Sequence, residues 1–103
     1  MSKKRTHKTK AEQRHLDRVA ALRCIVCRNL SLGETPAEIH HCNSGTGTAV
    51  RASHFRVIPL CHTHHRTGGY GVAIHAGRRR WEEKYGTEAQ LLAQTSLELG
   101  EAA

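Results

Sequence analysis

Hydrophobic residues recur at helical spacing near the start of the chain. Thr9 and Glu12 have the spacing of a capping box, and Leu16 and Val19 follow on one face. This pattern predicts a helix that begins after Thr9 and ends near Leu22, directly before a Cys-x2-Cys motif.

The last quarter of the chain predicts two further helices. Residues 78–85 form the first, which Gly86 closes, and the spacing of Trp81 within it favours a place in the core. Thr87 and Gln90 form a second capping box at the start of the last helix. Its apolar face consists of Leu91, Leu92, Thr95 and Leu99.

The middle of the chain predicts strands. Residues 38–41 and 55–60 are two short extended segments, joined over 43–53 by a loop rich in Gly, Ser and Thr. Residues 28–36 also form a loop, and residues 61–66 start a helix that the following glycines interrupt. The fold class is therefore α+β.

Composition limits the size of the core. With 103 residues, 38% hydrophobic and 4% aromatic, we expect a single domain over residues 11–100 that needs a disulfide or a metal to hold it together. Lys and Arg number 16 against 9 Asp and Glu, which favours a polyanionic partner such as nucleic acid. Residues 1–10 carry five of these cations and predict a flexible basic arm. No membrane-spanning run and no secretory signal occur, so we expect a cytoplasmic protein without a membrane partner.

The cysteines have the spacing of a zinc site. A Cys-x2-Cys motif near the first helix is followed by Cys-x2-His at the start of another, a ligand set that suits tetrahedral zinc. We assign four residues to a structural Zn²⁺, with Cys42 and His62 as competing ligands. The four are Cys24, Cys27, Cys61 and His64.

Three histidines are left over for a second metal site. His64 and His65 are adjacent on a helix, so their side chains diverge by about 100°, and His65 is free to face the His40–His41 strand. We expect His65 and one histidine of the pair to hold a divalent cation, while the other histidine activates water. Mg²⁺ prefers oxygen ligands, whereas imidazole suits Mn²⁺ and later metals, so the sequence leaves the cation open.

These motifs resemble the HNH, or His-Me finger, endonucleases, which have a ββα-metal fold. The resemblance covers roughly residues 24–66, and it implies that His40 and His65 are metal ligands and that His41 is the general base. The middle Asn of the family would fall at Arg56, where the nearest alternatives for its orienting role are Ser53 and His54.

Residues 38–88 resemble phage recombination-enhancement (Ref-like) nucleases, which are RecA-dependent HNH endonucleases that cut DNA. The shared residues include the run from Ile58 to Gly68 and the run from Gly71 to Gly77. This resemblance implies a phage or prophage origin, a bacterial host cell and a RecA filament as partner.

Two further residues have alternative roles. His75 could be a third metal ligand or a phosphate contact, or it could simply pack on its own turn. Glu38 either orients a ligand imidazole or faces solvent. Arginine suits phosphate contacts, and the candidates are Arg51, Arg66, Arg78, Arg79 and Arg80.

The alternatives to a nuclease are a non-catalytic zinc-binding nucleic-acid module, a ribonuclease or structure-specific nuclease, and a zinc-stapled recombination adaptor. A zinc-binding module has no use for His40, His41 and His65.

Overall fold

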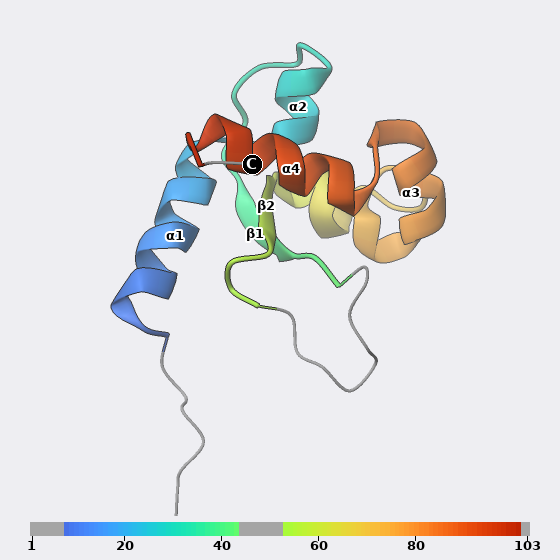
Figure 1. Cartoon of the computed structure of the whole chain (residues 1–103). Helices are drawn as coiled ribbons and strands as arrows, with labels where there is room; N and C mark the ends of the chain where they lie inside the picture. The colour runs from blue at the N-terminus through green and yellow to red at the C-terminus, as the bar shows by residue number, and fades with distance from the viewer. Residues whose placement is uncertain (1–7, 44–52, 102–103) are drawn as a thin grey trace, which may run out of the picture.

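A computed structural model describes residues 8–43 and 53–101. It has an antiparallel two-stranded sheet surrounded by helices (Figure 1), which confirms the α+β class. In chain order the elements are α1 (Lys10–Ala21), α2 (Ile25–Asn29), β1 (Glu38–His41), β2 (Val57–Leu60), the π-helical turn η1 (Thr63–Thr67), the 3-10 turn η2 (Ile74–Ala76), α3 (Arg78–Tyr85) and α4 (Glu88–Glu98).

The sheet places the two histidines of β1 on opposite faces. β1 and β2 pair with Glu38 opposite Leu60 and His41 opposite Val57. Because successive side chains of a strand alternate between faces, His40 and His41 point to different sides. His40 is buried and His41 is half-buried.

Both capping boxes expected from the sequence are present. Thr9 and Glu12 bond each other's backbone at the start of α1, and Thr87 and Gln90 do the same at the start of α4. The expected helix over residues 78–85 is confirmed as α3, and Trp81 within it is fully buried.

Three local expectations were wrong in detail. The loop expected over residues 28–36 starts two residues later, because the Cys-x2-Cys motif begins the short helix α2, which the Cys24 sulfur caps by accepting the Cys27 N–H at 3.5 Å. β2 begins at Val57 because Arg56 N–H is used in a turn to the Ser53 carbonyl.

The third difference is the segment after Cys61, which is a single π-helical turn. It ends where the Gly68 N–H bonds the Thr63 carbonyl, and a Cβ on Gly68 would lie 2.5 Å from Val72 Cγ1 and 2.6 Å from that carbonyl. The chain therefore turns away from a regular helix after one turn.

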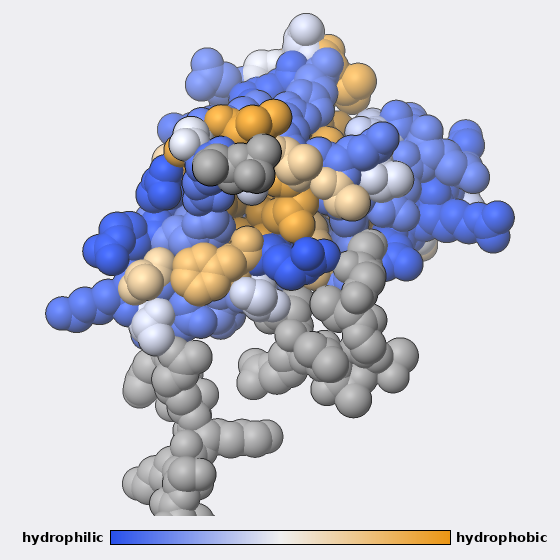
Figure 2. Space-filling model, in the orientation of Figure 1, coloured by the Kyte–Doolittle hydropathy of each residue, from blue (hydrophilic) through white to orange (hydrophobic). Residues whose placement is uncertain are grey.

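The core has two parts. α1 packs Leu16 and Val19 against Val57 of β2, and the larger part lies between the sheet and the other helices. That larger part contains the buried cysteines, Ile25, Val26, Ile58, Leu60, Ile74, Trp81 and Leu91. In the orientation of Figure 2, hydrophilic residues dominate the surface over α1 and α3, with hydrophobic residues between them. None of the helices in the described ranges is long and apolar enough to cross a membrane.

Candidate active site and metal centres

The structure brings together the four residues assigned to structural zinc. Cys24 caps α2, Cys27 lies within it, and Cys61 and His64 follow β2 across the π-helical turn. All four side chains are buried, and their ligand atoms lie within 4.8 Å of one another. Cys27 Sγ is 3.9 Å from Cys61 Sγ, and His64 Nδ1 is 3.9, 3.7 and 3.2 Å from the sulfurs of Cys24, Cys27 and Cys61.

These separations fit a zinc ion. With Zn–S near 2.3 Å and Zn–N near 2.0–2.1 Å, neighbouring ligand atoms of a tetrahedral site lie about 3.6–3.8 Å apart. Burial raises the pKa of the Cys24 thiol to about 12, so this thiol is protonated without a metal and would lose its proton when zinc binds. Burial also lowers the pKa of His64, which favours the neutral imidazole that a metal requires.

The two competing zinc ligands lie apart from this cluster. His62 is exposed and its Nδ1 is 2.9 Å from Thr67 Oγ1. Cys42 is buried in another group with His40 and Glu88, and burial raises its thiol pKa to about 12.

A second group consists of His40 on β1, His65 on η1 and His75 on η2. The ring of His75 lies 4.6 Å from that of His65 and 5.4 Å from that of His40, measured between centroids. His65 and His75 approach through their Nε2 atoms at 3.0 Å. Two nitrogens at about 2.1 Å from an octahedral ion, in adjacent positions, would also lie about 3.0 Å apart.

A carboxylate supports each of two histidines in this group. Glu38 Oε1 lies 2.8 Å from His65 Nδ1, and Glu88 Oε2 lies 2.7 Å from His40 Nε2. If each of these nitrogens donates its proton to the carboxylate, His65 Nε2 and His40 Nδ1 are left with lone pairs for a metal.

Only one of the two carboxylates was identified as a candidate from the sequence. Glu38 was a candidate because it alternates with His40 along the strand, and hydrogen bonds from Arg66 and His65 lower its pKa to about 2. Glu88 was missed. It follows the Thr87 cap as an ordinary first-turn acid, yet it is 2% exposed and reaches His40 from a helix 48 positions later in the chain.

His41, the neighbour of His40 on β1, contacts a histidine outside this group. Its Nε2 is 2.9 Å from His54 Nδ1, and the two rings are 5.1 Å apart. Burial, with smaller effects from His54, His40 and Lys8, lowers the pKa of His41 below its ordinary value. A neutral imidazole at neutral pH can accept a proton from water.

A surface groove of about 350 Å³ opens beside His40 and His75. Its lining includes His40, His75, Arg78 and Glu88, and Asn43 at the end of β1. The groove is large enough to admit a phosphate group next to the histidine cluster.

The five arginines proposed for phosphate contacts have different surroundings. Arg66 binds Glu38 with N–O distances of 2.6–3.2 Å, Arg78 lies 3.8 Å from both Glu82 and Glu88, and Arg80 lies 3.4 Å from Glu83. Arg79 is exposed on α3, while Arg51 lies outside the described residues.

A family model described as recombination enhancement, RecA-dependent nuclease matches residues 8–99. A comparison with curated proteins found no match.

Proposed function

The chain belongs to the family of recombination-enhancement, RecA-dependent nucleases, and from this membership we propose that it is a metal-dependent DNA endonuclease of the HNH type. The observation that carries the proposal is the group of His40, His65 and His75, which is separate from the Cys24 cluster, the four residues Cys24, Cys27, Cys61 and His64. A zinc ion that only stabilises the fold needs the Cys24 cluster and leaves these histidines without a role.

Two metals have different tasks in this proposal. Zn²⁺ bound by Cys24, Cys27, Cys61 and His64 is structural. His40, His65 and His75 hold a catalytic divalent cation such as Mg²⁺ or Mn²⁺, which, when bound, offsets the charge that develops on the scissile phosphate and the leaving oxygen. The three nitrogen donors favour Mn²⁺ by ligand type, and Mg²⁺ serves if water and phosphate oxygens complete its shell.

His41 is the proposed general base. If its Nε2–H donates to His54 Nδ1, Nδ1 of His41 carries the lone pair that takes a proton from the attacking water. His54 then holds the base in place, the orienting task that an Asn at position 56 would otherwise have. Glu38 and Glu88 are positioning residues, because each fixes the tautomer and orientation of one proposed metal ligand.

The ββα-metal arrangement is part of the same proposal. β1 and β2 supply the two strands, and the short turn η1 stands where the family has a helix. The nuclease domain extends over residues 11–100, preceded by a basic arm over residues 1–10, most of which lies outside the described residues. We place the protein in the cytoplasm of a bacterial host cell, with a phage or prophage origin.

DNA is the proposed substrate and a RecA filament the proposed partner. The family description supports both. Arg79 is exposed and available for phosphates, whereas Arg66 must give up part of its pairing with Glu38 to contribute. Arg51, Arg78 and Arg80 complete the proposed contacts.

The test is incubation of the zinc-loaded protein with supercoiled plasmid and with DNA in a RecA filament, each with Mg²⁺ or Mn²⁺. We expect metal-dependent cleavage that His65→Ala abolishes while one zinc per chain is retained. A parent protein that binds DNA but cuts neither substrate with either cation would favour the alternative, a non-catalytic zinc-binding module or recombination adaptor.

A further inference from the structure

Two of the few aromatic side chains of this protein lie on the surface. The chain has one Trp, two Tyr and one Phe. Trp81 is fully buried and Tyr85 packs against the core, but Phe55 is 49% exposed and Tyr70 is 74% exposed. Rings of this size contribute most to folding when buried, and at the surface their faces are free to stack on a ligand.

Phe55 lies at the His41 side of the proposed active site. It follows His54, whose Nδ1 contacts His41, and its ring lies 5.2 Å from the ring of His15 on α1. A small groove of about 270 Å³ runs along this contact, lined in part by Phe55, Arg14 and Arg18. An exposed ring and two cations therefore share one surface next to the proposed base.

Tyr70 lies at the His75 side of the same site. It is part of the connection between His65 and His75. Its ring lies over Gly77, where an added Cβ would come within 2.8 Å of the ring. Gly77 lines the groove beside His40 and His75, so Tyr70 borders that groove.

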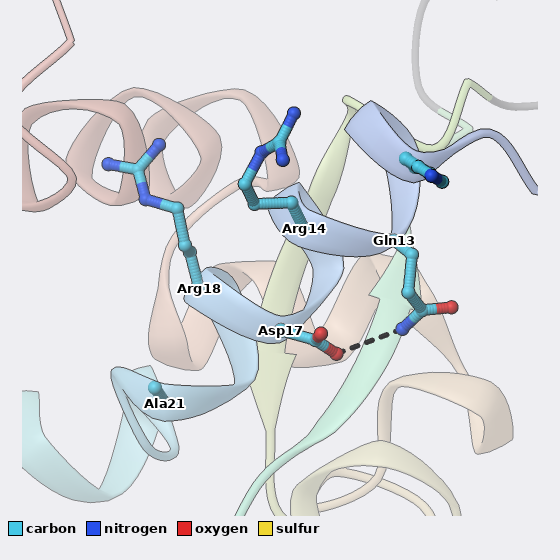
Figure 3. Close-up of a pocket in the computed structure, with 6 residues that line it drawn as sticks. Gln13, Arg14, Asp17, Arg18 and Ala21 are labelled. Carbon is cyan, nitrogen blue, oxygen red and sulfur yellow. Dashed lines mark hydrogen bonds between the residues drawn. The ribbon is translucent and has the colours of Figure 1, made fainter.

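The exposed face of α1 continues the basic surface from Phe55. Figure 3 shows Arg14 and Arg18 extending from the same side of the helix, while Gln13 and Asp17 bond each other at 2.9 Å on another side. Within the described ranges Arg14 has no ion pair, whereas Arg18 bonds the Leu99 carbonyl at 2.8 Å and lies 3.8 Å from Glu101. A shallow groove of about 540 Å³ along this face is also lined by Lys10.

We propose that Phe55 and Tyr70 are stacking platforms for unpaired bases of single-stranded DNA, with Arg14 and Arg18 contacting the phosphates of the same strand. Surfaces that bind single strands combine exposed aromatic rings with a basic track, because every base has a face that stacks on a ring. Bases in an intact duplex already stack on one another, so their faces are not accessible to these rings. The inference rests on the proposed function, since it names the form of DNA that this site receives.

The test is fluorescence anisotropy with a labelled oligothymidylate and with a duplex of equal length, without added divalent cation. We expect Phe55→Leu and Tyr70→Leu each to weaken single-strand binding roughly tenfold, as expected for the loss of one stacked base, and to leave duplex binding unchanged. Phe55→Tyr keeps the aromatic face and should bind like the parent. Leu97→Ala, which removes another exposed hydrophobic side chain on α4, is the matched control.

A second variant tests the phosphate track. Arg14→Gln should make the slope of log K against log salt concentration shallower by about 0.7 for each lost phosphate contact on single-stranded DNA. Unchanged single-strand binding in both leucine variants, or an equal loss on duplex, would overturn the inference. Because binding is measured without the cleavage reaction, an inactive nuclease with the expected binding pattern would contradict the proposed function alone.

Discussion

The nitrogen atoms already occupied by hydrogen bonds determine what each histidine is available to do. His65 uses Nδ1 for Glu38, His40 uses Nε2 for Glu88, and His41 uses Nε2 for His54. Each ring therefore has its other nitrogen for a metal or a proton, and that of His65 lies 3.0 Å from His75 Nε2. The same residue type thus serves as proposed ligand and proposed base according to its neighbours.

The first prediction concerns His41. Replacing it with alanine should lower the single-turnover cleavage rate roughly 10²–10⁴-fold, the usual contribution of a general base. Affinity for DNA should stay the same, because it depends on Lys and Arg at phosphates. Cleavage by His41→Ala at the parent rate would transfer the role of base to another group, with His54 as the next candidate.

The second prediction concerns Glu88. Glu88→Gln keeps the volume of this buried side chain but removes the charge that holds His40 Nε2–H, so Mn²⁺ affinity should fall roughly 10-fold to 100-fold. Titration of the zinc-loaded protein with Mn²⁺ measures this. Glu83→Gln, an exposed carboxylate on α3, is the control and should leave the affinity unchanged. Equal affinities in parent and Glu88→Gln would remove Glu88 from the site.

At the scale of elements, the parts of the fold that could be predicted are those with local signals. The helices over Lys10–Ala21 and Glu88–Glu98 have capping boxes in the sequence. In the strand over Glu38–His41, Glu38 and His40 alternate with their neighbours, which places both on one face. The π-helical turn at Thr63–Thr67 ends at Gly68, where an added Cβ would clash with Val72, and the sequence did not distinguish this turn from the start of a regular helix. The Glu88–His40 pair depends on where α4 packs, which has no local pattern in the sequence.

The third prediction concerns the connection between α2 and α4. Arg28 binds Glu98 with two N–O distances of 2.8 and 2.9 Å, and hydrogen bonding to Arg28 is the main cause of the lowered pKa of Glu98. Since both side chains are partly exposed, Glu98→Gln should lower the free energy of unfolding by about 1 kcal/mol at pH 7.

The pH dependence of that loss has a definite sign. A carboxyl with a lowered pKa stabilises the folded state above its unfolded pKa, and the effect disappears as the pH falls through its folded pKa. Urea unfolding of the zinc-loaded protein should therefore show a difference between parent and Glu98→Gln that is constant near neutral pH and shrinks below pH ~4.5. A difference independent of pH would mean that the charge of Glu98 is not the cause.

At the scale of the whole molecule, the Cys24 cluster joins segments that are far apart in the sequence. It connects α2 to the chain after β2 in a domain with a small core. Zinc binding by such a site contributes on the order of 10 kcal/mol in small peptides. The fold and the proposed catalytic group are therefore linked, because η1 carries both His64 and His65.

The fourth prediction tests that linkage. Cys24→Ser should lose zinc and be largely unfolded by circular dichroism at 37 °C. Cys42→Ala is the control, because Cys42 is equally buried but lies outside the four-residue cluster. This control should retain one zinc per chain and melt cooperatively. A Cys24→Ser protein with the parent's spectrum and melting temperature would contradict a structural zinc site.

The proposed catalytic metal site is tested most directly by the single-turnover rate of DNA cleavage, measured against Mn²⁺ concentration, for the parent and for His75→Ala. His75 is exposed, so its replacement should leave the fold intact. We expect the parent rate to saturate with Mn²⁺, and His75→Ala to need at least tenfold more Mn²⁺ to reach half its maximal rate. Cleavage that does not depend on the cation, or an identical Mn²⁺ dependence in both proteins, would contradict a catalytic metal held by the three histidines.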